Sequence, residues 1–103
     1  MTIVPMAGRH LEQVRAIDEL VYPNPWSAGT WRRELSADDR LHVIAHCADV
    51  VAGHAGLLFV LEEVHVTTVA VHPDRQGEGI GSRLVLALLD EARAHGSTAA
   101  TLE

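Results

Sequence analysis

A glycine-rich segment, His72–Gly81, lies between a β-branched run and an apolar-periodic segment, and it constrains the fold more than any other part of the chain. The run from Val64 to Val71 is typical of a strand, and an amphipathic helix is expected to begin near Ser82. Three alternating glycines let the backbone turn its N–H groups inward, and the positive end of the helix dipole lies directly behind them. The segment is therefore expected to hold the phosphate of a ligand.

The spacing of these glycines excludes two common phosphate-binding motifs. A dinucleotide fingerprint that starts at Gly77 needs a third glycine at position 82, where the chain has Ser82. A Walker loop needs a lysine, and the sequence contains none. What remains is the pattern Gln-x-x-Gly-x-Gly from Gln76 to Gly81, which follows a strand that ends with Val69–Pro73.

This pattern resembles the central motif of the GNAT superfamily of N-acetyltransferases, which surrounds the pyrophosphate of acetyl-coenzyme A. The resemblance also implies that the pantetheine arm of the cofactor pairs with the preceding strand as an added strand would. The implied pyrophosphate contacts are Gln76, Gly77, Glu78, Gly79, Ile80, Gly81 and Ser82. The implied pantetheine contacts are Val69, Ala70 and Val71, which are also expected to pack in the sheet.

Two features of the loop are expected to weaken cofactor binding. Many relatives have a basic residue where Gly77 stands, and Glu78 adds a negative charge beside the expected phosphate site. Arg75 and Arg83 are the candidates to compensate for that charge.

Apolar periodicity predicts the element order β-α-α-β-β-β-α-β, an α+β fold in which helices flank a mixed, mostly antiparallel sheet. The expected strands are Thr2–Met6, Leu41–Cys47, Val51–Val60, Glu63–Val71 and Ala99–Glu103, with turns at 48–50 and 61–62. The last strand follows a long crossover, so it is expected to lie parallel to its predecessor with a right-handed connection.

Three helices complete this prediction. The first carries an apolar stripe and ends at Pro23, and the second runs through Trp31 to Leu35 with Ser27 as its candidate N-cap. The third is expected to end at Gly96. The apolar stripe of the first helix is Leu11, Val14, Ile17 and Val21, and that of the third is Leu84, Val85, Leu88, Leu89 and Ala92.

The predicted order matches the first part of the GNAT fold, and GNAT proteins continue with a further helix and two more strands. Either the sequence is a fragment, or another chain supplies these elements by strand exchange. An uncovered edge strand favours pairing with a second copy, so a homodimer through the exposed sheet edge is one expectation.

The amino-acid composition disfavours several classes of function. With 103 residues, 48% of them hydrophobic, residues 1–103 are expected to form a single domain. A net charge of −6 disfavours binding to nucleic acid or to an anionic membrane, and suits a cationic substrate. No stretch reaches the roughly 18 apolar residues of a membrane span, so a cytoplasmic location is expected. Cys47, the only cysteine, is expected to be a small buried apolar side chain, and the histidines lack the spacing of a metal site.

The resemblance implies that an amine attacks the thioester of acetyl-coenzyme A directly. Because an amine is mostly protonated near neutral pH, a general base must remove a proton. Glu103 occupies the place of that base in the subgroup that acetylates the N-terminal alanine of a ribosomal protein. The tyrosine that serves as acid in the family has no counterpart, since the only tyrosine, Tyr22, lies far upstream. We therefore expect cofactor binding with weak or absent acetyl transfer.

A second resemblance to the same subgroup is Pro25-Trp26-Ser27, which lies near the peptide entrance there. Trp26 and Trp31 are either helix-packing aromatics or residues that line the substrate path. The expected acceptor is a protein or peptide N-terminus. The alternatives are a small-amine acetyltransferase and a non-catalytic fragment that binds coenzyme A or dimerises.

Overall fold

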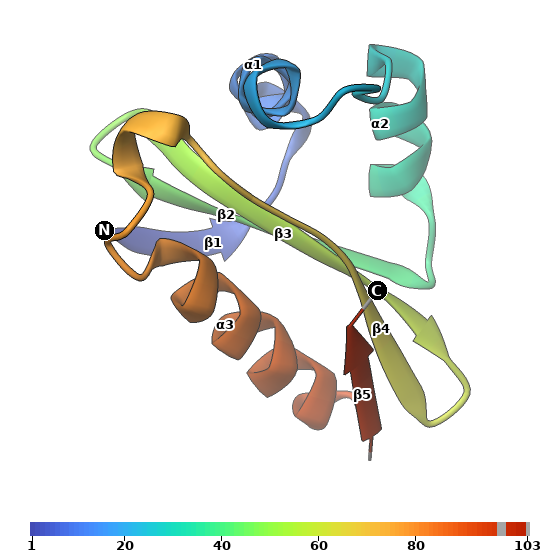
Figure 1. Ribbon diagram of the computed structural model, residues 1–103. Helices are drawn as coiled ribbons and strands as arrows, with labels where there is room; N and C mark the ends of the chain where they lie inside the picture. Colours follow the sequence, from blue (N-terminus) through green and yellow to red (C-terminus); the bar gives the residue numbers. More distant parts are fainter. Residues whose placement is uncertain (97–98, 103) are drawn as a thin grey trace.

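Five strands form one sheet, with helices on both of its faces, in the computed structural model of the chain (Figure 1). The structure describes residues 1–96 and 99–102. The strands are β1 (Thr2–Pro5), β2 (Arg40–Cys47), β3 (Val50–Val60), β4 (Glu63–Val71) and β5 (Ala99–Leu102). The helices are α1 (Leu11–Val21), α2 (Ala28–Ser36) and α3 (Ile80–Ala94), with short 3-10 turns at Gly8–His10 and Pro73–Arg75.

The strands are adjacent in chain order, β1-β2-β3-β4-β5. The first four pair antiparallel, and β5 pairs parallel to β4 after the crossover through α3. This topology confirms the predicted order of elements and the parallel last strand. Helices α1 and α2 lie on one face of the sheet and α3 lies on the other (Figure 1). Each face therefore has its own core, since each amphipathic helix covers apolar side chains of the strands.

The ends of the helices follow local chemistry. The Ser27 hydroxyl accepts a hydrogen bond from the Thr30 N–H at 3.2 Å, which confirms Ser27 as the N-cap of α2. Gly96 adopts φ +87° after the last turn of α3, as a C-terminal stop requires. Helix α3 begins two residues before the expected Ser82, because Gly79 in a left-handed conformation already serves as its N-cap.

A bulge interrupts β4 and reverses the faces of its residues. Gly56 of β3 pairs with Thr68, whereas the next residue of β3 pairs with Val66, so Thr67 has no partner there. Val66 therefore belongs to the core under α3, and Ala70 belongs to the core under α1 and α2. The side chains of Val69 and Val71 pack against the α3 core, as the expected role in the sheet requires.

The expectation that Cys47 is a small buried apolar side chain is wrong. It is half-buried at the end of β2, and its sulfur accepts a hydrogen bond from Arg75 Nη1 at 3.4 Å. The loop after β4 folds back over the end of β2, and this brings the guanidinium to the thiol.

Candidate cofactor and acceptor site

The backbone of the glycine-rich loop needs glycine at two of its three alternating positions. Gly77 has φ +86° and Gly79 has φ +79°, a region that other residues adopt only with strain. Gly81 has no such requirement, because it lies in the first turn of α3. A β-carbon there would meet Val71 Cγ2 at 3.6 Å and Val69 Cγ1 at 3.7 Å, which is ordinary contact.

The first turn of α3 offers unpaired N–H groups to a ligand. The first helical hydrogen bond runs from the Arg83 N–H to the Gly79 carbonyl at 3.2 Å, and no side chain caps the helix. The N–H groups of Ile80, Gly81 and Ser82 accordingly have no acceptor within the described part of the chain. These donors and the helix dipole can hold a diphosphate without any lysine.

Arg75 offsets the negative charge of the loop. Its Nε lies 3.1 Å and 3.0 Å from the two carboxylate oxygens of Glu78, and its Nη2 lies 3.0 Å from Oε1. These hydrogen bonds lower the pKa of Glu78 and, together with the Cys47 contact, raise the pKa of Arg75. Glu78 is thus turned toward its own counter-ion in the loop.

The edge of β4 is open next to this loop. Strand β5 pairs with residues Glu63–Val66 only, so among the described residues no strand covers β4 beyond the bulge. The N–H of His72 donates to β3 at 2.8 Å. Because peptide groups alternate along a strand, those of Val69 and Val71 point away from β3, and that of Ala70 points toward it.

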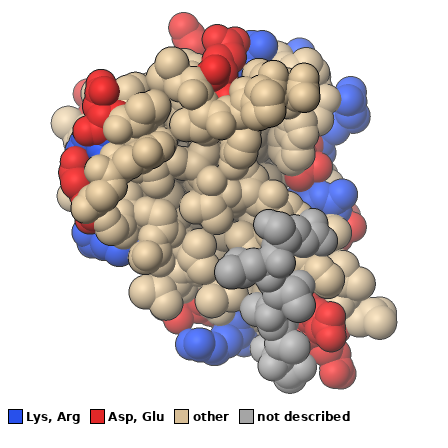
Figure 2. All heavy atoms as spheres, in the orientation of Figure 1, with Lys and Arg blue, Asp and Glu red and all other residues tan. Residues whose placement is uncertain are grey.

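Two side chains already contact the outward carbonyls of that edge. The Tyr22 hydroxyl donates to the Val69 carbonyl at 2.9 Å, and the Gln76 amide donates to the Val71 carbonyl at 3.3 Å. Figure 2 shows that charged side chains lie around the periphery of this view, while the middle of the face is uncharged. An extended arm would find hydrogen-bonding groups along this edge of β4.

A pocket of about 250 Å³ opens beside the bulge of β4. Tyr22 lines this pocket and also contacts β4 next to the bulge, because its hydroxyl lies 3.1 Å from Thr68 Oγ1. The Trp26 ring stands edge-on to the Trp31 ring with 4.9 Å between centroids. The lining residues are Asp18, Tyr22, Pro23, Asn24, Pro25, Trp26, Trp31, Thr67 and Thr68. The segment singled out for its resemblance, Pro25-Trp26-Ser27, thus contributes two of the walls.

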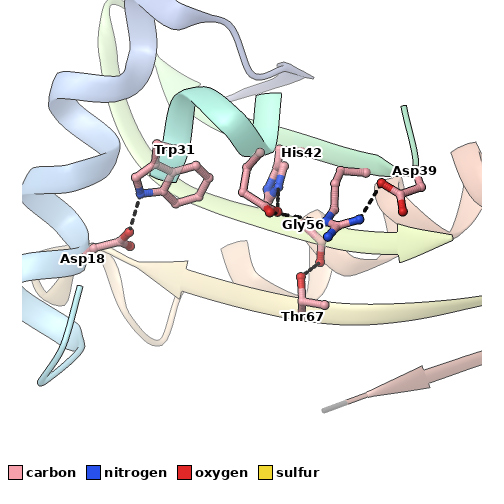
Figure 3. A network of polar contacts seen from close by, with 8 residues as sticks. Asp18, Trp31, Asp39, His42, Gly56 and Thr67 are labelled. Atoms are coloured by element: carbon pink, nitrogen blue, oxygen red, sulfur yellow. Dashed lines mark hydrogen bonds and ion pairs between the residues drawn. The ribbon is translucent and has the colours of Figure 1, made fainter. Parts of the chain in front are cut away.

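The floor of this pocket holds a buried carboxylate. Asp18 is 3% exposed, and its Oδ2 accepts a hydrogen bond from the Trp31 indole at 3.2 Å (Figure 3). Its Oδ1 lies 2.6 Å from His54 Nε2. Asp18 and His54 are not among the site residues predicted from the sequence, although a signal was present: Asp18 follows Leu11 by seven residues and therefore falls on the apolar face of α1.

A second polar cluster supports Trp31 from its other side. His42 Nε2 lies 3.1 Å from Glu34 Oε1, and Arg40 Nε lies 3.3 Å from Glu34 Oε2 (Figure 3). The His42 ring packs edge-on against Trp31 with 5.1 Å between centroids. Burial lowers the pKa of His42, although the Glu34 hydrogen bond acts in the opposite direction. Trp31 also packs edge-on against His54, with 5.4 Å between centroids, so two histidine rings contact the indole that forms this pocket wall.

Glu103, the expected general base, lies outside the described residues. Within the described residues, no group of three or more His, Cys, Asp or Glu side chains is placed to hold a metal ion. The same part of the chain has no helix with the length and apolar character needed to cross a membrane.

A loop with two glycines at positive φ leads into α3 beside the open edge of β4, an arrangement that suits a phosphate ligand with an extended arm. The chain belongs to the acetyltransferase (GNAT) family, whose model matches residues 11–103. It is 36% identical over 74 residues to an N-alpha-acetyltransferase RimI of Mycobacterium tuberculosis, covering 68% of this chain and 47% of that protein.

Solved structures show the same fold. The ribosomal-protein-S18-alanine N-acetyltransferase from Escherichia coli superposes with a TM-score of 0.83 and 27% identity, over 93% of this chain and 61% of that chain. An aminoglycoside 6'-N-acetyltransferase complexed with coenzyme A gives a TM-score of 0.82 at 22% identity, over 93% and 57% of the two chains. The present chain thus spans less than two thirds of these relatives' length.

Proposed function

We propose that this chain carries the acetyl-coenzyme A site of an N-acetyltransferase, which transfers the acetyl group to an amine. The observation that supports this most is the unpaired N–H groups of Ile80, Gly81 and Ser82 beside the open edge of β4. The first feature suits the pyrophosphate, and the second suits the amide-bearing pantetheine arm. The coenzyme A complex of the aminoglycoside enzyme, which has the same fold, supports this choice of ligand.

The chain direction gives the orientation of the cofactor. The loop that would hold the pyrophosphate follows Val71, so an arm that pairs with β4 must run back from Val71 to Val69. The next residues in that direction are Thr68 and Thr67, which line the pocket. The acetyl group would therefore lie beside the pocket, and the pocket would receive the acceptor amine.

We propose the N-terminal alanine of a ribosomal protein as the acceptor, on the likeness to two enzymes. These are the RimI of M. tuberculosis and the alanine N-acetyltransferase of E. coli. The proposed base for this reaction remains Glu103. Its assignment rests on the resemblance alone.

Calorimetric titration with acetyl-coenzyme A tests the cofactor site. Replacing Gly79 with alanine puts a β-carbon on a residue at φ +79°, which costs about 1–2 kcal/mol in the left-handed region. We expect the loop to relax to avoid that strain, so that affinity falls by about 5- to 30-fold. Gly96→Ala is the matched control, because Gly96 has a similar φ of +87°, open surroundings and a position at the other end of α3.

The expected result is binding by the wild type, weaker binding by Gly79→Ala, and unchanged affinity for Gly96→Ala at equal fractions of folded protein. Equal affinities of Gly79→Ala and the wild type would contradict the proposed loop. Absence of any heat of binding in the wild type would contradict the proposed function itself.

A further inference from the structure

We propose that Asp18 is a specificity-determining residue whose buried carboxylate recognises a primary ammonium group in the pocket between Tyr22 and Trp26. The inference deepens the proposed function and rests on it, since the pocket adjoins the acetyl group only if the cofactor runs along β4. The ligand class is a short aliphatic amine in its protonated form.

The pocket lining contains a single carboxylate. Of the described residues that line it, only Asp18 has an acidic or basic side chain. A carboxylate that is 3% exposed is costly to bury unless a cation or several donors compensate for it. Among the described residues, the ionisable side chain in direct contact with this carboxylate is His54, at 2.6 Å. The indole of Trp31 contacts the other carboxylate oxygen.

His54 contacts the carboxylate from inside the core. The ring is fully buried, and its Nδ1 has no hydrogen-bond partner within the described part of the chain. Nε2 is therefore the ring atom that contacts Asp18, and it does so at one carboxylate oxygen only.

The carboxylate retains capacity for a further donor. Two oxygens offer about four acceptor positions, and Trp31 and His54 use one on each oxygen. An ammonium group brings three N–H donors and a compensating charge. The aromatic walls add to this preference, because the faces of indole and phenol rings attract cations. The net charge of −6 for the whole chain favours the approach of such a ligand.

The size of the pocket limits what can enter. About 250 Å³ is less than the roughly 300–1,000 Å³ typical of pockets that enclose a drug-sized ligand. Pro23 and Pro25 also line it, and proline has no backbone N–H to donate. The pocket is therefore suited to the end of a molecule, namely an ammonium group on a short carbon chain.

Two small amides of equal size test this proposal on the wild-type protein. Alaninamide at a pH of about 6.5 is mostly an ammonium ion, since its amino group titrates near 8. Lactamide has a hydroxyl group in place of the ammonium. Titrations are followed by the indole N–H resonance of Trp31, because this group donates to Asp18 and reports on the carboxylate. We expect at least about tenfold preference for alaninamide.

The variant Asp18→Asn keeps the size of the side chain and removes its charge, and it is expected to abolish the preference. Asp38→Asn removes the same charge from an exposed turn, and it is expected to retain the preference. If Asp18→Asn does not fold, Trp26→Leu removes an aromatic wall of the pocket without touching the buried pair. That variant is expected to lower alaninamide affinity several-fold and lactamide affinity less.

Equal binding of the two amides by the wild type would overturn the inference, as would a retained preference in Asp18→Asn or an unmoved Trp31 resonance. The acetyl-coenzyme A titration distinguishes failure of the proposed cofactor site from failure of the proposed role of Asp18. Cofactor binding without discrimination between the amides would refute only the role of Asp18.

Discussion

Replacing Gly56 with alanine should destabilise the protein strongly, because His42 lies where the new methyl group must go. A β-carbon at Gly56 would lie 2.1 Å from His42 Nδ1 and 2.3 Å from Cε1, far inside van der Waals contact. The ring cannot swing away freely. It is held by Glu34 at 3.1 Å and packs against Trp31.

The loss in the free energy of unfolding can be estimated from the contacts of His42 that Gly56→Ala disrupts. Overpacking a core typically costs about 1–3 kcal/mol, and losing a hydrogen bond to a charged group costs about 1.5–3 kcal/mol. Since the two effects overlap, we expect Gly56→Ala to lower the free energy of unfolding by about 2–5 kcal/mol. A domain of this size has about 5–15 kcal/mol in total, so the loss is a large fraction of its stability.

Thermal unfolding followed by circular dichroism measures the effect. At about 4 °C per kcal/mol, the melting temperature of Gly56→Ala should fall by at least about 8 °C. Gly81→Ala is the matched control, since its β-carbon makes ordinary contacts and its helical position favours alanine. The double variant His42→Ala/Gly56→Ala should be more stable than the sum of the single effects predicts. A Gly56→Ala melting temperature within about 2 °C of the wild type would show that the His42 ring does not block the added methyl group.

Two further predictions concern charge. The pKa of His42 is lowered from 6.5, first by burial, so the unfolded chain binds a proton more readily than the folded one. The contribution of His42 to the free energy of unfolding should therefore be complete above a pH of about 6.5 and decrease as the pH falls. Urea unfolding at a series of pH values measures this, and the free energy of unfolding of His42→Gln should depend less on pH than that of the wild type. Glu78→Gln removes the anion that Arg75 now neutralises, so acetyl-coenzyme A affinity should rise by about two- to fivefold at low salt and less at high salt. An unchanged or lower affinity would count against a phosphate at this loop.

Much of the fold was predictable because its signals are local. Hydrophobic periodicity placed α1, the hairpin strands and β4 within a residue or two of their observed ends. The Ser27 cap and the Gly96 stop are also local, since each depends on a hydrogen bond or a backbone angle of neighbouring residues. The loop between β4 and α3 belongs to this class as well.

The pocket depends on contacts that no local pattern reports. The bulge at Thr67 changes which face each later residue of β4 occupies, and nothing in its β-branched sequence distinguishes it from a regular strand. Tyr22 reaches β4 across 47 positions, and Asp18 reaches His54 across 36. Of the features that form the pocket, only the position of Asp18 on the apolar face of α1 could have been predicted from the sequence.

The proposed cofactor site requires that peptide N–H groups around the start of α3 bind the diphosphate of acetyl-coenzyme A. This is tested by titrating the cofactor into ¹⁵N-labelled protein and following the backbone amide resonances. We expect the largest shifts at Gly77–Ser82, with further shifts at Val69 and Val71 along the open edge of β4. Saturating cofactor that leaves the amides of Gly77–Ser82 unmoved, or that moves a different surface instead, would contradict the proposed site.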